Sequence, residues 1–396
     1  MAYRILMLLE NTTYPEDVRV RKEANTLASA GYDVAIIVSG RKGQQAVEKL
    51  DGVRVHRFPA AFAKDSRVLS FFVEYAWASL WLTLLSWWVL LRHGFDAIHL
   101  HNPPDSLFAV AMPFRLFGKA IVYDNHDLTP ELIEVKFHSR LLRRVFEVLE
   151  GLSCSWSDAV ITTSEIKKEV LVRRHNISSK KITVVRNGPS RGELDVIELR
   201  QPGCGDLDVR FGFIGAVDPQ DGVESIIDSL HSFKRFQPGL RFSCRIIGDG
   251  IGLDGVRKRT RALGLEREVE FCDFLPWPEA MQALSECDIC VDAPPLNPYH
   301  RSNEAVKVLE YMAQGKPMVL TDSPGHRAAA SDAALYAESQ NPDAFAARLS
   351  ELVHNPDLAR KLGQTGRARF ESTFCWEIMG SRLVSVYHGL QGRRDG

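Results

Sequence analysis

The sequence predicts an α/β protein made of two Rossmann-like domains that face each other across a cleft. Apolar segments of strand length alternate with helical segments along the chain, which predicts βαβ units and parallel sheets. A length of 396 residues exceeds what one core comfortably serves, so two domains are expected. The polar, loosely patterned stretch 190–208 lies between two such alternating halves and has the composition of a linker.

Each half can be followed strand by strand. The first domain, expected over 1–189, shows a helical segment at Asp17–Ala30 and apolar strand segments at Arg4–Leu9, Asp33–Ser39, Val53–Phe58, Ala97–Leu100, Ile121–Tyr123, Ala159–Thr163 and Ile182–Val185. The second domain, expected over 209–376, shows strand segments at Val209–Ile214, Phe242–Ile247, Val269–Cys272, Ile289–Asp292 and Met318–Leu320. A closing helix over about 377–396 is expected to pack back onto the first domain.

Composition and charge exclude several functional classes. The chain is 45% apolar and 25% charged, which is ordinary for a globular protein, and its net charge of −1 gives no reason to expect nucleic acid as a partner. No signal peptide is visible before the first strand. The seven cysteines are scattered, and the CxxC formed by Cys287 and Cys290 alternates with apolar residues, so buried thiols are expected rather than a zinc site. These features predict a cytoplasmic protein.

The stretch Val68–Leu91 holds four of the seven tryptophans. Its uncharged part, Tyr75–Leu91, is barely long enough to span a bilayer, and a span would place strands of one sheet on opposite sides of the membrane. We therefore expect no transmembrane helix. Two interpretations remain open: a helix packed on the sheet, and a helix lying partly in a membrane surface, where tryptophan is enriched.

A second amphipathic stretch, Lys136–Leu152, is basic. Its positive residues include Lys136, Arg140 and Arg144. Such a face is either simply solvated or attracted to anionic lipid headgroups. The choice stays open at this stage.

Two histidine-bearing segments follow strands of the first domain. His101 follows Ala97–Leu100, while His126 and Asp127 follow Ile121–Tyr123. Because ligands of open α/β sheets bind at the carboxyl ends of the strands, we expect His101 and His126 to be functional.

The stretch Arg301–Thr321 predicts one helix followed by a buried strand. Ser302 and Asn303 are N-cap residue types, and Gly315 supplies a left-handed stop. Lys307 and Glu310 then share one helical face. The bland interpretation is a capped surface helix with a Lys307–Glu310 ion pair. The functional one is a helix N-terminus that, with Lys307, binds a phosphate, while Glu310 accepts hydrogen bonds from a ribose.

Taken together, the motifs resemble the retaining GT-B glycosyltransferases of family 4 from end to end, and within them the bacterial enzymes of surface-polysaccharide assembly. The resembling segments are PEDVRVRKEANTLASAGYDV, DAIHLHNPPD, IVYDNHDLTPE, VVRNGPS, GFIGAVDPQDGVESII, IIGDG, FCDFLPWPE, SNEAVKVLEYMAQGKPMV and LGQTGRARFESTF.

The resemblance implies transfer of a sugar from a nucleoside-diphosphate sugar, with retention of configuration at the anomeric carbon. A UDP-sugar is expected in preference to a GDP-sugar. It implies no metal and no cofactor. The first domain would bind the acceptor, a lipid-linked or free saccharide of cell-surface polysaccharide synthesis, and the second domain the donor. A lipid-linked acceptor would place the protein on the inner face of the cell membrane, through Val68–Leu91 and Lys136–Leu152.

Site residues carry over from the family one by one. Glu310 would bind the ribose, and Gly215 would lie beside the donor. The backbone of Phe274 and Leu275 would read the base. Along the donor sugar would lie Asn303, Glu304 and Ala305. His101 would contact the donor sugar, with His126 and Asp127 on the lip of the cleft. The resemblance implies catalytic roles for His101, Lys307 and Glu304.

Three departures from the family pattern bear on the diphosphate. The first glutamate of the E-x7-E motif falls on Ser302, with Glu304 close enough to replace it. The usual arginine and lysine that neutralise the diphosphate fall on Ala216 and Asp221, and the glycine-rich loop after the first strand is missing. We expect Lys307, aided by Arg301 or Arg19, to supply the missing charge, because an unpaired diphosphate in a dry site is costly.

The expected mechanism is front-face transfer, in which the departing diphosphate accepts the acceptor's proton. A covalent intermediate on Glu304 is the lesser alternative. Two other functions share this architecture: a sugar-nucleotide 2-epimerase, and a non-catalytic partner subunit of a glycosyltransferase complex.

Overall fold

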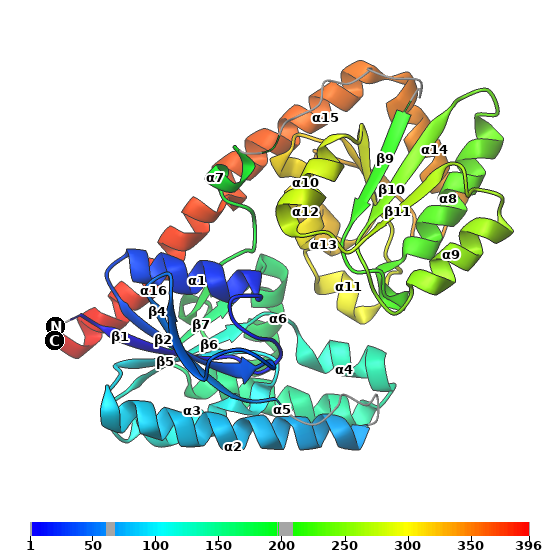
Figure 1. Cartoon of the computed structure of the whole chain (residues 1–396). Coiled ribbons are helices and arrows are strands. Elements are labelled where there is room, and N and C mark those ends of the chain that lie inside the picture. Colours follow the sequence, from blue (N-terminus) through cyan, green and yellow to red (C-terminus); the bar gives the residue numbers. More distant parts are fainter. Residues whose placement is uncertain (1, 61–67, 196, 198–208, 396) are drawn as a thin grey trace. The chain divides into compact units, whose positions relative to one another are not determined.

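The computed structural model describes residues 2–60, 68–195, 197 and 209–395, and the chain divides into two α/β units (Figure 1). One unit comprises Met1–Arg186 and Met379–Gly396, and the other comprises Asn187–Ile378. Most of the expected linker, 198–208, lies outside the described residues. Its start belongs to the second unit and contains the short helix α7, Arg191–Leu194.

The first unit is built on a sheet with the strand order β3-β4-β2-β1-β5-β6-β7-β8. All described pairings are parallel except that of β3 with β4. The edge strand β3 was not predicted, because two of its four residues, the consecutive Glu48 and Lys49, are charged and leave no apolar segment. The strands are β1 (Arg4–Leu8), β2 (Asp33–Gly40), β3 (Val47–Leu50), β4 (Val53–Pro59), β5 (Ala97–His101), β6 (Ala120–Asn125), β7 (Ala159–Thr162) and β8 (Ile182–Val184).

Helices cover both faces of this sheet (Figure 1). On one face lie α1 (Val18–Ser29) and the C-terminal helix α16 (Trp376–Asp395), whose Tyr387 hydroxyl is 2.7 Å from His99 Nδ1 of β5. The other face carries α2 (Val68–Arg92), α3 (Phe108–Arg115), α5 (Arg140–Trp156) and α6 (Glu165–His175), which enclose a core that includes Leu6, Leu100 and Phe114.

Helix α2 packs on the sheet along one side. Ala78, Leu82 and Val89 are buried in the core, whereas Leu84 and Trp88 are 54% and 45% exposed. As expected, no helix among the described residues combines the length and the apolar character that crossing a membrane requires. Packing on the sheet therefore explains the apolar residues on the inner side of α2, but not why Leu84 and Trp88 on its outer side are apolar as well.

The basic stretch Lys136–Leu152 is not one helix, contrary to the prediction. Helix α4 (Thr129–Phe137) ends where His138 adopts a left-handed conformation with φ of 50°. A new helix, α5, then begins, because the Ser139 side chain accepts a hydrogen bond from the Leu142 amide and caps it.

The second unit has a parallel sheet with the order β11-β10-β9-β12-β13-β14. Its strands are β9 (Val209–Ile214), β10 (Phe242–Ile247), β11 (Val269–Asp273), β12 (Ile289–Asp292), β13 (Met318–Thr321) and β14 (Leu335–Ala337). One apolar cluster packs α8 (Val223–Phe236), α9 (Leu253–Ala262) and α14 (Pro342–His354) on one face, and a second packs α10 (Trp277–Ser285), α12 (Val306–Ala313) and α13 (Pro324–Ala330) on the other. Helix α15 (Pro356–Arg369) closes the unit.

The burial pattern of α2 yields a stability prediction. Leu82→Ala should lower the free energy of unfolding of the first unit by about 2–5 kcal/mol, because it leaves a cavity in the core. Leu84→Ala should change it by less than about 0.5 kcal/mol, since its side chain is exposed. Urea unfolding of both variants measures the difference, and equal losses would show that α2 is packed differently.

Candidate functional site

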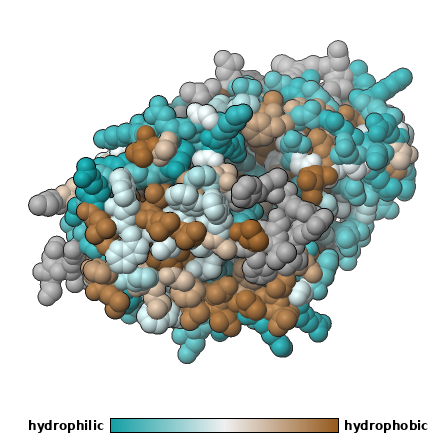
Figure 2. Space-filling model, turned by 60° about the horizontal axis from the view of Figure 1, so that its bottom comes forward, coloured by the Kyte–Doolittle hydropathy of each residue, from teal (hydrophilic) through white to brown (hydrophobic). Residues whose placement is uncertain are grey.

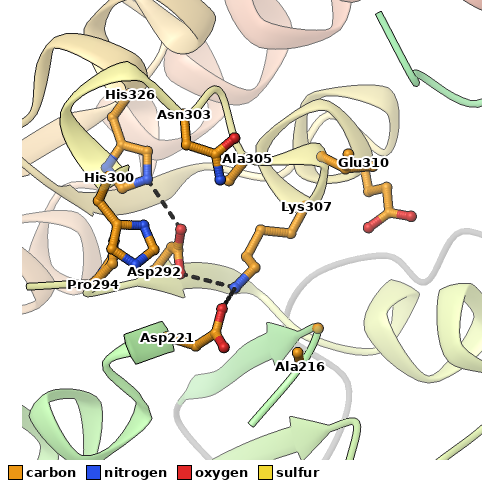
Figure 3. Close-up of a pocket in the computed structure, with 12 residues that line it drawn as sticks. Ala216, Asp221, Asp292, Pro294, His300, Asn303, Ala305, Lys307, Glu310 and His326 are labelled. Atoms are coloured by element: carbon orange, nitrogen blue, oxygen red, sulfur yellow. Dashed lines mark hydrogen bonds and ion pairs between the residues drawn. The ribbon is translucent and has the colours of Figure 1, made fainter. Parts of the chain in front are cut away.

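A cavity of ≈ 240 Å³ lies in the second unit, at the carboxyl ends of β9 and β12 (Figure 3). Parallel α/β sheets bind ligands at this edge. The lining residues come from loops and helices that follow these strands: Gly215, Ala216, Asp221, Asp292, Pro294, His300, Asn303, Ala305, Val306, Lys307, Glu310 and His326.

The segment Arg301–Gln314 that forms one wall is broken, where one helix was predicted. Helix α11 (Pro298–Ser302) ends before Asn303 and α12 begins only at Val306, while Asn303 and Ala305 are extended. Ser302 and Asn303 are therefore not the caps of α12. Packing explains the break, because the Asn303 carbonyl lies against Gly325 of α13, where a Cβ atom would be only 2.1 Å from the oxygen. Gly315 does end α12 in a left-handed conformation, with φ of 63°.

Lys307 points from α12 to the floor of the cavity (Figure 3). Its Nζ atom is 3.3 Å from Asp292 Oδ1 and 4.0 Å from Asp221 Oδ1, and it lies 4.2 Å from the centre of the Phe213 ring. Lys307 therefore pairs with Asp292 and Asp221, and not with Glu310 as the bland interpretation had it. Gly215 makes room for this lysine, since a Cβ at that position would be 2.9 Å from Lys307 Cε.

Asp292 is the centre of this charge cluster. It is 1% exposed, and although burial alone would raise its pKa, Lys307 and His326 together hold the pKa below its usual value. His326 Nε2 is 3.0 Å from Asp292 Oδ2, and its Nδ1 is 2.7 Å from the Thr321 carbonyl. Both ring nitrogens of His326 therefore lie within hydrogen-bond distance of an oxygen atom.

Asp221 is the second carboxylate at Lys307. Burial raises its pKa, and the neighbouring Lys307 offsets this only in part. Where the family pattern has a lysine, this chain therefore holds a carboxyl group with a raised pKa.

His300 was not predicted and also lines the cavity. It is 8% exposed, its ring hydrogen-bonds the Gln220 backbone, and its Nε2 has no hydrogen-bond partner among the described residues. Burial lowers the pKa of His300. Neither His300 nor Asp292 belongs to a motif, which is why sequence reasoning missed them.

The cavity gathers only part of the predicted donor site. Gly215, Asn303, Ala305, Lys307 and Glu310 line it, whereas Phe274, Leu275, Arg301, Ser302 and Glu304 do not. The Glu310 carboxylate accepts a hydrogen bond of 2.8 Å from Trp277 Nε1, and Figure 3 shows it directed away from Lys307. Phe274 is 74% exposed, and Ser302 donates to the Tyr299 carbonyl.

The predicted residues of the first unit gather at the ends of β5 and β6. His101 Nδ1 is 3.2 Å from His126 Nε2, which is 3.0 Å from Asp124 Oδ2. His101 also stacks on His99 at 4.2 Å, and burial, together with His99, keeps the pKa of His101 well below its usual value. Asp127 is 3.4 Å from the Lys167 ammonium. Asp124 belongs to strand β6 and not, as expected, to the loop after it.

Arg19 takes part in the same buried network and not in a phosphate site. Its guanidinium donates two hydrogen bonds to Asp124, at 2.7 and 2.9 Å, and lies 3.0 Å from Glu23. It is 4% exposed. This corrects the expectation that Arg19 is available to a diphosphate.

Glu23, His99, His101 and Asp124 have ligand-type atoms within 4.8 Å of one another, a set that could hold a metal ion. Arg19 lies 3.0 Å from Glu23 and 2.7 Å from Asp124, so one guanidinium is shared between the two carboxylates of this set.

Solved structures show how these units are classed. The chain superimposes on sucrose-phosphate synthase from Thermosynechococcus elongatus with a TM-score of 0.78, over 99% of this chain and 100% of that one, at 16% identity. At this identity the likeness shows the fold alone, which is the GT-B fold of glycosyltransferases.

Sequence relatives define the family. Residues 17–188 match the model of the glycosyl transferase 4-like domain, and residues 202–369 match that of the glycosyl transferases group 1. EpsD of Bacillus subtilis, which is named as a glycosyltransferase, is 41% identical over 296 residues, covering 70% of this chain and 73% of EpsD. The phosphatidyl-myo-inositol mannosyltransferase of Propionibacterium freudenreichii subsp. shermanii is 24% identical over 91% of this chain and 87% of its own.

The chain spans 59% and 54% of the length of two further curated glycosyltransferases that it matches. On the family matches, this chain belongs to the GT-B glycosyltransferases of the family 4 type.

Asp105, which lies in a short 3-10 helix after β5, yields a pH prediction. Burial raises the pKa of Asp105, which accepts a hydrogen bond from the Tyr123 hydroxyl, to about 7. Because the folded state then holds a proton that the unfolded state has released, stability should fall as pH rises from about 4 to about 7, by up to about 4 kcal/mol.

Asp105→Asn should remove this fall, whereas Asp51→Asn, in an exposed turn, should leave it unchanged. Urea unfolding at pH 4.5 to 7.5 checks both variants. The same slope in Asp105→Asn and the unmodified chain would contradict the burial of an acid group at Asp105.

Proposed function

We propose that this protein is a retaining glycosyltransferase of the hexosyl or N-acetylhexosaminyl type, independent of metals. It would move a sugar from a nucleoside-diphosphate sugar, a UDP-sugar in preference to a GDP-sugar, to a lipid-linked or free saccharide. This transfer would serve bacterial cell-surface polysaccharide synthesis. The observation that carries this proposal is the cavity at the carboxyl ends of β9 and β12, where Lys307 lies on the floor and the broken segment before α12 forms a wall.

The cavity has the groups that a diphosphate requires. The first N–H groups of α12 have no acceptor within the helix, and the helix dipole favours a negative charge there. Lys307, in the first turn of the same helix, supplies the ammonium that family members draw from the positions occupied here by Ala216 and Asp221. Glu310, one turn further along, would accept hydrogen bonds from the ribose.

In the proposed reaction, Lys307 moves from its carboxylate partners to the diphosphate. The bond between the anomeric carbon and the diphosphate oxygen breaks, and the acceptor hydroxyl attacks from the same face. The hydroxyl proton passes to the departing phosphate oxygen, so no protein base is needed. The protein contributes orientation and electrostatic stabilisation, which together supply most of the rate enhancement in such transfers.

The hydrogen bond between Asp292 and His326 allows Lys307 to move without leaving a buried carboxylate unpaired. Because His326 already hydrogen-bonds Asp292, the carboxylate does not become unpaired when Lys307 turns away. Asp221 can take up a proton instead. Glu304, which does not line the cavity, is less suited to covalent attack, and this favours the front-face route. His101 remains our proposal for the residue that the first unit offers to the donor sugar.

The proposed acceptor is carried by a lipid, and the protein would act at the cytoplasmic face of the cell membrane, on its surface. The name of the related Propionibacterium enzyme describes transfer to a phosphatidyl-inositol lipid, which supports this proposal. The stretches Val68–Leu91 and Lys136–Leu152 are the proposed contacts.

Lys307→Met tests the catalytic proposal. Turnover of the donor should fall by about 10²–10³-fold, because a preorganised cation at the leaving group is lost. The exposed Lys361→Met on α15 is the matched control and should be unchanged. Initial rates measure the effect, with circular dichroism to confirm folding. Unchanged turnover in a folded Lys307→Met protein would remove this lysine from the mechanism.

Glu310→Gln tests the ribose contact. The amide oxygen can still accept from Trp277, so the fold should persist, but the charged acceptor for the ribose hydroxyls is gone. Loss of a charged hydrogen bond weakens binding by about 10–100-fold. Calorimetry should show this loss for both UDP and uridine, since both carry the ribose. A loss for UDP alone would instead place Glu310 at the phosphates.

A further inference from the structure

The outer sides of α2, α3 and α5 expose large apolar side chains that nothing among the described residues covers. Leu84 and Leu91 of α2 are 54% and 83% exposed, and Leu116 and Phe117, which follow α3, are 89% and 56% exposed. On α5, Leu141 and Val148 are 72% and 61% exposed. We call this surface the outer helical face.

The three helices form one continuous layer. Helix α3 packs beside both α2 and α5, and all three cover the same side of the first unit's sheet. In Figure 2, which brings this side of the molecule forward, apolar residues gather over it. Contiguous apolar surface of this kind marks an interaction site more often than chance exposure.

The spacing of the exposed apolar residues along the helices shows that they are not simply the edge of the buried core. On α2, Leu80, Leu84 and Leu91 recur at i, i+4 and i+11 on the outer side, while Leu82 and Val89 face the core. On α5, Leu141 and Val148 are outward, at i and i+7. Each helix therefore has an inner apolar side that the core uses and an outer one that the fold does not need.

Positive charge surrounds the outer helical face. Arg92 ends α2, and Arg140 and Arg144 begin α5; all three are exposed and form no ion pair within the described part of the chain. The acidic neighbours Glu134 and Glu147 are both held by Arg143.

We propose that the outer helical face docks on an anionic lipid bilayer, with its leucine and phenylalanine side chains at the level of the acyl chains and Arg92, Arg140 and Arg144 at the phosphates. This rests on the proposed function, since it gives the enzyme access to an acceptor held by lipid. The binding is interfacial, because no described helix can cross the membrane.

Charge decides between a membrane and a second copy of the chain. Two copies that met through this face would bring their unpaired arginines together, whereas an anionic surface attracts them. The helix α3 corner, Leu116 and Phe117, adds a third contact that the tryptophan and basic stretches of the sequence did not indicate.

Flotation with vesicles tests this docking on the full chain. The protein should float with vesicles of phosphatidylglycerol and phosphatidylcholine, and bind pure phosphatidylcholine at least tenfold less. The triple variant Leu84→Glu, Leu116→Glu, Val148→Glu should remain in the soluble fraction. Arg140→Gln with Arg144→Gln should weaken partition by about thirtyfold, because each basic residue at an anionic surface contributes about fivefold.

Phe236→Glu, on an exposed site of the second unit, is the matched control and should float as the unmodified chain does. UDP binding, measured by calorimetry in every variant, separates the two proposals: it should be unchanged, since no substituted residue lies in the donor cavity. If the triple variant floated with the vesicles, the proposed docking face would be wrong. The same would follow if the unmodified chain did not bind anionic vesicles and instead formed a dimer through these residues. If the unmodified chain did not bind UDP, that result would instead overturn the proposed function.

Discussion

The contact between the Lys307 ammonium and the buried Asp292 carboxylate is the interaction on which the proposed donor cavity depends. A carboxylate with 1% exposure is stable only when it is paired, and it is paired here from two sides, by Lys307 and His326. The surrounding backbone serves this contact. Gly215 leaves space for the lysine stem, and Gly325 lets the Asn303 carbonyl approach, which separates α11 from α12 and places Lys307 in the first turn of α12.

The two units use buried charge differently. In the first, Arg19 is enclosed by Asp124 and Glu23, and this closed network supports the His101–His126 pair from beneath. In the second, Lys307 lies at a cavity beside two carboxylates, and the pKa of one of them, Asp221, is raised by burial. An enclosed cation stabilises structure, whereas one that can exchange partners is suited to meet a substrate. The same physical rule thus separates a structural arginine from a candidate catalytic lysine.

Local pattern was sufficient for much of this molecule and insufficient for the rest. The alternation of strands and helices and the left-handed stop at Gly315 follow from spacing and residue type. The break before α12 could not be predicted, because the capping signal of Ser302 and Asn303 is overridden by packing against α13, which is distant in sequence. Asp292 was missed and Arg19 was misjudged for the same reason: their partners lie 15 and 105 residues away.

The central claim is that Lys307 exchanges its carboxylate partners for the diphosphate and that Asp221 then takes up a proton. Calorimetry of UDP binding near pH 7, in buffers of different ionisation enthalpy, measures this directly. The account predicts uptake of up to one proton on binding UDP and none on binding uridine, which lacks the diphosphate. A binding enthalpy for UDP that does not depend on the buffer, or equal affinities for UDP and uridine, would contradict it.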